Sequence, residues 1–245
     1  MNDQFRVKLE RQTWLEIGEY LKKSDTIIVP FGAVEQHGPS CPLGTDKLIA
    51  EHIATMLGAK KNVLVGPAIP VGDSLIHLNF LGTIALNPST LLLVAKDYIK
   101  SLYGVGFRRF LVVNGHEDNR PPLLSAFSEL GNELSGLKYD VCEFWDFEPF
   151  RDKMFQYFGD RYGGHADACD ASIVMAIEES LVIKERLASE YPHVSYRISR
   201  DLVGDLYTRS GVINADQRLA SVDIGRELLE VAIQCYSQKL AQLME

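Results

Sequence analysis

The sequence has few cysteines, and none of them are paired. Cys41, Cys142, Cys169 and Cys235 are scattered along the chain without a C-x-x-C pair. Disulfide frameworks and structural zinc sites both use paired or clustered cysteines, so the spacing argues against both. We expect reduced thiols that are packed inside the protein.

Basic residues are outnumbered by acidic ones, and no stretch is rich in lysine or arginine. The 245 residues include 25 Lys and Arg against 33 Asp and Glu, which gives a formal net charge of −8 at pH 7. Proteins that bind nucleic acid or an anionic membrane need a basic surface. The composition therefore predicts neither nucleic acid nor membrane as a partner and favours a small-molecule substrate.

Long apolar runs are also missing. No stretch reaches the roughly 18 uninterrupted apolar residues that span a bilayer, and the polar start Met1-Asn2-Asp3-Gln4 is unlike a signal peptide. These absences predict a cytoplasmic protein. The 46% of hydrophobic residues are enough for a large core, and no repeat or linker divides the chain. We expect one domain over residues 1–245.

Short β-branched runs alternate with amphipathic segments. The pattern predicts strands at residues 26–31, 63–65 continuing through 67–71, 109–113 and 139–144, and helices at 12–23, 46–58, 91–102, 121–134, 165–187 and 218–243. Because a helix that connects two parallel strands packs on the sheet, this alternation predicts a mainly parallel sheet. The expected fold class is α/β, a three-layer α/β/α domain.

The segment after the first expected strand carries side chains that can bind a metal ion. Glu35 and His37 are two residues apart, so in extended backbone both point to the same side. Asp46 follows a Pro-Leu-Gly turn where the next helix is expected to begin. Together they predict half of a metal site. The alternative is that Asp46 caps the helix while Glu35 and His37 make ordinary loop contacts.

A second set of such side chains, His116, Glu117 and Asp118, follows the strand expected at 109–113. Parallel sheets bind ligands beyond the carboxyl ends of their strands, so both sets are expected at one edge. In an extended segment His116 and Asp118 point together while Glu117 points away. The alternative is that Asp118 caps the helix beginning near Pro121.

Four segments carry a resemblance to a known family. They are Pro-Phe-Gly-Ala-Val-Glu35-Gln-His37-Gly-Pro, Gly-Thr-Asp46, Val-Asn-Gly-His116-Glu-Asp118-Asn and Gly-His165-Ala. In this combination the chain resembles the creatininase family of metal-dependent amidohydrolases. The resemblance implies two divalent metal ions per chain, zinc or manganese with iron as a further option, and a homo-oligomer, commonly a hexamer.

The resemblance also implies a role for each metal-binding residue. Asp46 bridges the two ions, Glu35 and His116 bind the first, and His37 and Asp118 bind the second. His165 resembles the catalytic histidine that passes a proton to the leaving group. The alternative for His165 is a structural hydrogen bond at the start of a helix.

The chain departs from the family at several positions. Creatininase itself has Glu where this chain has Asp118, and Asp167 and Asp170 replace a Gly and a Glu. Tyr162 is the only aromatic residue of the 159–164 loop, where creatininase has an aromatic substrate clamp. We therefore expect a substrate other than creatinine. The candidate substrate contacts are His77, Glu117, Asp167, Asp170 and Tyr162.

Two adjacent divalent ions lower the pKa of bound water and polarise a carbonyl group. The resemblance therefore implies a hydrolase that uses metal-bound hydroxide to cleave a C–N bond of an amide, cyclic amide or formamide in a small polar substrate. The alternative at the same site is hydrolytic C–C ring opening of a cyclic polyol ketone of the keto-inositol type. A non-catalytic binding protein of the same fold ranks lowest, because all five ligand positions hold competent residues.

Other motifs and histidines give no further evidence for a functional site. No Gly-x-Ser-x-Gly elbow and no G-x-G-x-x-G loop is present, which argues against an acyl-enzyme and a dinucleotide site. His52 and His193 are expected to be structural or exposed. Phe144, Trp145 and their aromatic neighbours are expected in the core or at an interface.

Overall fold

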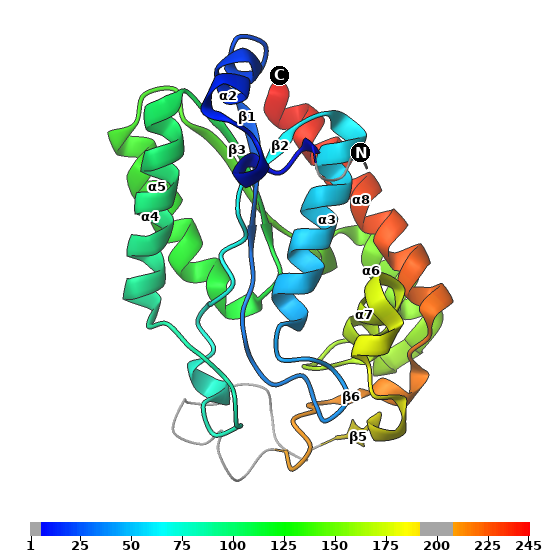
Figure 1. Ribbon diagram of the computed structural model, residues 1–245. Helices are drawn as coiled ribbons and strands as arrows, with labels where there is room; N and C mark the ends of the chain where they lie inside the picture. The colour runs from blue at the N-terminus through cyan, green and yellow to red at the C-terminus, as the bar shows by residue number, and fades with distance from the viewer. Residues whose placement is uncertain (1–5, 192–207) are drawn as a thin grey trace.

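The computed structural model describes residues 6–191 and 208–245. Within these residues a four-stranded parallel sheet has the order β2-β1-β3-β4 (Figure 1). The strands are β1 (Thr26–Phe31), β2 (Leu64–Val65), β3 (Arg109–Asn114) and β4 (Lys138–Glu143). The predicted parallel sheet is confirmed, and so are the bounds of its first strand.

The central strand β1 is buried along its whole length. It pairs with β3 from Thr26 opposite Arg109 to Phe31 opposite Asn114, so the two strands end side by side. A strand covered on both faces can be apolar at consecutive positions rather than at alternate ones. This explains why residues 26–31 read as a continuous apolar run.

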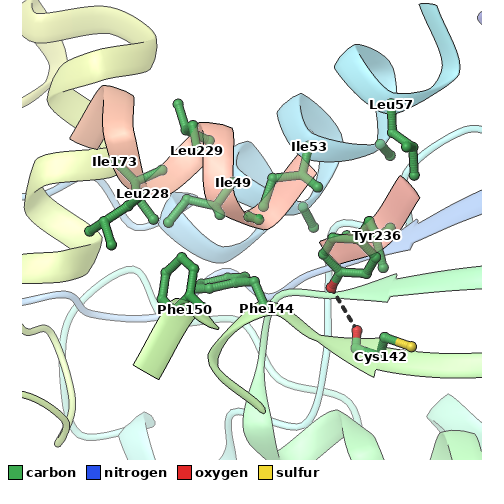
Figure 2. Packing of buried hydrophobic residues seen from close by; sticks show 14 of the residues in the cluster. Ile49, Ile53, Leu57, Cys142, Phe144, Phe150, Ile173, Leu228, Leu229 and Tyr236 are labelled. Carbon is green, nitrogen blue, oxygen red and sulfur yellow. Dashed lines mark hydrogen bonds between the residues drawn. The ribbon is translucent and has the colours of Figure 1, made fainter. Parts of the chain in front are cut away.

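One face of the sheet is covered by α3 (Thr45–Lys61), α6 (Glu148–Phe158), α7 (Ala168–Glu178) and α8 (Val222–Met244). Side chains of α3 and α8 pack against each other above the sheet, among them Ile53 and Leu228 (Figure 2). The Tyr236 hydroxyl donates a hydrogen bond to the Cys142 carbonyl oxygen at 2.9 Å. The hydrogen bond lets a buried phenol tie α8 to the strand β4.

The opposite face is covered by α2 (Trp14–Leu21), α4 (Pro88–Val105) and α5 (Arg120–Glu133). Figure 1 shows α4 and α5 on one side of the strands and α3 with α8 on the other. Two apolar clusters thus sandwich the sheet. This is the predicted three-layer α/β/α class.

The remaining elements are short. Two-residue strands β5 (Ser189–Glu190) and β6 (Ala215–Asp216) pair antiparallel. The 3-10 helices are η1 (Leu9–Arg11), η2 (Leu75–His77), η3 (Glu117–Asn119), η4 (Phe144–Asp146), η5 (Gly159–Arg161), η6 (Glu179–Leu181), η7 (Lys184–Arg186) and η9 (Gln217–Leu219).

Three expected boundaries were wrong. The helix expected over 165–187 is only α7, because Ala166 has a positive φ of 56° and the Asp167 side chain caps the helix. The last helix begins at Val222, after η9 and the Ser221 cap, rather than at 218. The strand expected through 67–71 reduces to one bridge between Ile69 and Phe31, because its two prolines cannot donate to a ladder.

The helix α6 was not predicted. Its buried residues Phe150, Met154 and Phe158 are four apart, which is the spacing of one helical face. The aromatic run before the helix obscured this period. Phe144 and Phe150 both belong to the buried core, as expected. His193 lies outside the described residues. No helix in the described ranges is both long and apolar enough to cross a membrane.

The strand order creates a crevice at one edge of the sheet. The chain leaves β1 through α3 toward β2 on one side, and leaves β3 through α5 toward β4 on the other. At such a reversal the connections separate and leave space beyond the strand ends. The segments after β1 and β3, which carry the candidate ligands, both lie at this edge.

Two helical glycines should respond oppositely to alanine substitution. A Cβ on Gly225 of α8 would lie 1.9 Å from the Ser172 carbonyl oxygen of α7, whereas one on Gly18 of α2 meets nothing within 4 Å. We expect Gly225→Ala to lower the free energy of unfolding by about 1–3 kcal/mol through overpacking. We expect Gly18→Ala to raise it by about 0.4–1 kcal/mol. Urea denaturation of both variants checks this, and equal midpoints would contradict the close α7–α8 contact.

Candidate active site

Four of the predicted ligands meet beyond the ends of β1 and β3. Glu35 and His37 follow β1, Asp46 is the second residue of α3, and His116 follows β3. Their exposed fractions are 1%, 2%, 6% and 7%, so this charged cluster is buried. Burying charged groups is costly unless they are paired or bind a cation.

Two glycines allow this meeting. A Cβ on Gly32 would lie 2.4 Å from the Lys47 Cα, and one on Gly115 would lie 2.4 Å from the Asp46 carbonyl oxygen. Any other residue would push the start of α3 away from the strand ends. The sequence therefore uses glycine where the helix must touch the backbone that follows each strand.

Asp46 lies between two histidines. Its Oδ1 is 2.9 Å from His37 Nε2, and its Oδ2 is 3.1 Å from His116 Nδ1. His116 Nδ1 is also 3.3 Å from Glu35 Oε1. One carboxylate thus contacts both imidazoles, which is the placement of a group that can bridge two cations.

Two further histidines face Glu35 from other segments. His77, at the end of η2, and His165, before α7, each place a ring nitrogen 3.7 Å from Glu35 Oε1. Their rings are stacked with centroids 4.3 Å apart and planes 22° apart. His165 is also 4.8 Å from the His37 ring centroid. The cluster therefore brings together the four histidines that the sequence analysis placed in the site.

Backbone carbonyls fix the ring protons of three histidines. His37 Nδ1–H donates to Glu35 O at 3.3 Å, His116 Nε2–H to Asp73 O at 2.8 Å, and His165 Nε2–H to Gln36 O at 2.7 Å. A carbonyl only accepts, so the other nitrogen of each ring is free to present a lone pair to the carboxylates. Histidines that bind metal ions usually make this kind of hydrogen bond.

The donor set fits divalent cations. Glu35 Oε2 is buried without a hydrogen bond, and both carboxylate oxygens of Asp46 face imidazole nitrogens. Among the described residues, ligand atoms lie within 4.8 Å of one another in two groups, Glu35 with His37 and Asp46, and Glu35 with His77 and His165. Carboxylate oxygens and imidazole nitrogens of this kind suit zinc and manganese.

Two of the histidine rings, His37 and His116, hold a second proton that a cation would replace, because the adjacent carboxylates raise the pKa of both. Burial disfavours charge on His37, but the adjacent Asp46 carboxylate raises the pKa of His37 to about 10. Burial would raise the pKa of Glu35, but His116 and the other histidines hold it well below its usual range. Burial, His77 and His37 lower the pKa of His165 to about 3. His165 is therefore neutral, while the two central carboxylates stay ionised.

Asp118 stands apart from the other predicted ligands. Like His116, it belongs to neither of the two ligand groups found in the described ranges. Unlike His116, which lies 3.3 Å from Glu35 and 3.1 Å from Asp46, it is half-buried in the wall of the cavity. Burial raises the pKa of Asp118, opposed by the charge of His116. Its role as a ligand stays a prediction, and so do the roles of the other residues.

A cavity of about 750 Å³ opens onto the cluster. The five residues expected to contact substrate all line it: His77, Glu117, Tyr162, Asp167 and Asp170. Asp167 Oδ1 accepts hydrogen bonds from two backbone amides of α7, so this carboxylate caps the helix as well. Burial and the neighbouring Asp167 raise the pKa of Asp170 to about 8.

Sequence reasoning missed several residues of this site, among them Gln36 and Trp145. Gln36 is 5% exposed and contacts both His77 and His165, and Trp145 lines the cavity. Gln36 lies between two candidate ligands, but its extended spacing points it away from them. Trp145 was expected only in a core or an interface. Its place in the cavity wall depends on the turn into η4 after β4, which the sequence pattern did not show.

Comparison with known proteins extends these observations. The creatininase family profile, described as creatinine amidohydrolase, matches residues 10–240. Creatinine amidohydrolase of Pseudomonas putida is 24% identical over 237 residues, which cover 91% of each chain. A mycofactocin precursor peptide peptidase of Mycobacterium tuberculosis is 35% identical over 120 residues, 45% of this chain and 47% of that protein. The 3-dehydro-scyllo-inosose hydrolase of Thermotoga maritima is 30% identical over 111 residues, 45% of this chain and 36% of that protein.

Solved structures share the fold. A mutant creatininase of type II matches with a TM-score of 0.89 and 22% identity over 97% of this chain and 98% of that one. A manganese form of creatininase and a zinc–zinc form of a mutant match with TM-scores of 0.86 and 0.87 at the same identity and coverage. The family profile spans almost the whole chain and the fold agrees with it, so this protein belongs to the creatininase family of hydrolases.

Proposed function

We propose that this protein is a two-metal hydrolase that cleaves a C–N bond of an amide, cyclic amide or formamide in a small polar substrate. The observation that carries this proposal is the position of Asp46 between His37 and His116, at 2.9 and 3.1 Å. The buried Oε2 of Glu35, which has no hydrogen bond, supports it, because a cation would offset its charge.

The proposed metal ligands follow the contacts of Asp46 and Glu35 with the histidines and, for Asp118, the resemblance to the family. Asp46 would hold both ions, with Glu35 and His116 on the first and His37 and Asp118 on the second. When bound, divalent ions supply Lewis-acid activation of water and of the substrate carbonyl. The zinc and manganese forms of the solved creatininases support these two metals as candidates.

The proposed proton carrier is His165. His165 donates its Nε2–H to Gln36 O at 2.7 Å, which leaves Nδ1 free at 3.7 Å from Glu35 Oε1. In this role Nδ1 accepts a proton and returns it to the leaving nitrogen. The contact with Gln36 supports the first half of this transfer, because it keeps the ring proton on Nε2 and leaves the lone pair of Nδ1 available.

A second substrate class has one observation in its favour. The 3-dehydro-scyllo-inosose hydrolase is 30% identical to this chain over 111 residues, which supports ring opening of a cyclic polyol ketone. The amidohydrolase and peptidase relatives support the C–N reaction instead. A screen of cyclic amides, formamides and keto-inositols with zinc- or manganese-loaded protein separates the two, and turnover of a keto-inositol alone would reject the C–N proposal.

We propose a homo-oligomer of this protein in the cytoplasm. The resemblance to the family favours a hexamer, and large apolar side chains at the surface support self-association, with Trp14 81% and Leu81 98% exposed. Light scattering at micromolar concentration should give a multiple of the 27.4 kDa chain mass. A monomer mass at this concentration would reject the proposal.

The first test of the site removes the central carboxylate. Asp46→Ala should lose bound metal and activity together, because Asp46 is the side chain that contacts both His37 and His116 in the described part of the chain. Elemental analysis of purified protein measures the metal, and circular dichroism checks the fold. Asp97→Ala, at an exposed aspartate of α4, is the control and should keep both. Full metal content in Asp46→Ala would show that Asp46 is not the bridge.

The second test separates ligand from proton carrier. His165→Ala should keep its metal and lower kcat by roughly 10²–10⁴-fold, as positioned acid–base groups usually contribute. His52→Ala, in α3 and outside the cavity lining, should keep wild-type kcat. Loss of metal from the His165 variant would make His165 a ligand. Unchanged turnover would leave it only a structural hydrogen bond.

A further inference from the structure

The buried amide of Gln36 has one fixed orientation. Its Nε2 is 2.9 Å from the Gly211 carbonyl oxygen, and its Oε1 is 3.0 Å from the Gly38 amide nitrogen. A carbonyl only accepts and a backbone N–H only donates, so these two contacts decide which end of the amide carries hydrogens. The Gln36 Nε2 therefore points one N–H to Gly211 and has a second N–H left.

The chain is built closely around this amide. Gly38 and Gly211 have φ values of +69° and +87°, a region that favours glycine. A Cβ on Gly211 would lie 1.8 Å from Gln36 Oε1. Gln36 itself is 5% exposed. The side chain is thus held by segments far apart in the sequence rather than resting in a loop.

The second N–H of Gln36 fixes the tautomer of His77. Gln36 Nε2 is 3.1 Å from His77 Nδ1, so Nδ1 must accept and carries no proton. The neutral ring then has its proton on Nε2, which lies 3.7 Å from Glu35 Oε1 and lines the cavity. His37, His116 and His165 have the opposite arrangement, with a free nitrogen facing the carboxylates.

We propose that His77 is a hydrogen-bond donor to the substrate and not a metal ligand. A ligand must offer a lone pair, and the Gln36 contact uses the only one that neutral His77 has. Stacking on His165, with ring centroids 4.3 Å apart, holds the ring plane. This inference rests on the proposed hydrolase function. It means that the group of Glu35, His77 and His165 is not a metal site, whereas the group of Glu35, His37 and Asp46 is.

The donor suits the oxygen atom that gains charge during hydrolysis. Water attack turns the carbonyl oxygen of an amide into an oxyanion, which a fixed N–H binds more strongly than the starting carbonyl. Removing one such donor lowers kcat by roughly 10²–10³-fold in other hydrolases. His77 thus binds the substrate carbonyl oxygen, while His165 handles the proton.

The ligand and donor roles predict different metal contents. His77→Leu should keep the zinc content of the wild-type protein and lower kcat by about 10²–10³-fold with little change in KM. His77→Gln, whose side-chain amide can place an N–H near the same position, should recover part of kcat. His52→Leu in α3 is the control and should change neither. Loss of zinc from both His77 variants would overturn the proposal, because it would make His77 a ligand.

The tautomer can be read without any substrate. In ¹⁵N-histidine-labelled full-length protein, the His77 ring should show a protonated Nε2 and an unprotonated Nδ1, identified by the signals lost in His77→Gln. Gln36→Glu removes the donor to Nδ1, so the pattern should reverse and kcat should fall. An unprotonated Nε2 in the unsubstituted protein would overturn the inference. If no substrate is turned over, the proposed function fails, but the ring signals still decide the tautomer.

Discussion

The site depends on one close contact, between the start of α3 and the backbone just after β1 and β3. Gly32 and Gly115 have no side chains there, and a Cβ on either would come within 2.4 Å of α3 atoms. This contact brings Asp46 between His37 and His116. The strands β1 and β3 end at the same level, because Phe31 lies opposite Asn114. The candidate ligands that follow the two strands therefore start side by side. The packing of the backbone therefore determines where the candidate ligand side chains meet.

Backbone carbonyls then give the histidines different roles. Carbonyl oxygens hold a proton on the outer nitrogen of His37, His116 and His165, and a side-chain amide does the reverse for His77. Four chemically identical rings can thus act as lone-pair donors or as an N–H donor. The difference comes from what lies behind each ring and not from the ring itself.

The sequence predicted the parts of the site that follow from local spacing. Glu35 and His37 share a side because they are two residues apart, and His116 follows a strand whose end was correctly placed at one sheet edge. The contacts of Gln36 could not be predicted in this way, because its partners lie at residues 77 and 211. The α6 helix was missed for a different reason, because the aromatic run before it packs into the same core and hides where the helical period begins.

The inner and outer parts of the cavity have different origins, which explains how one family can act on different substrates. The inner carboxylates and histidines are fixed by strand ends and by the helix contact, so a change there would disturb the fold. The outer wall comes from η4, from the segment before α7 and from Glu117 at the start of η3. In this wall the Trp145 ring packs on Phe144 and the Tyr162 ring on Phe155. Substitutions in the outer wall can therefore alter the shape and charge that a substrate meets, while the reaction centre stays unchanged.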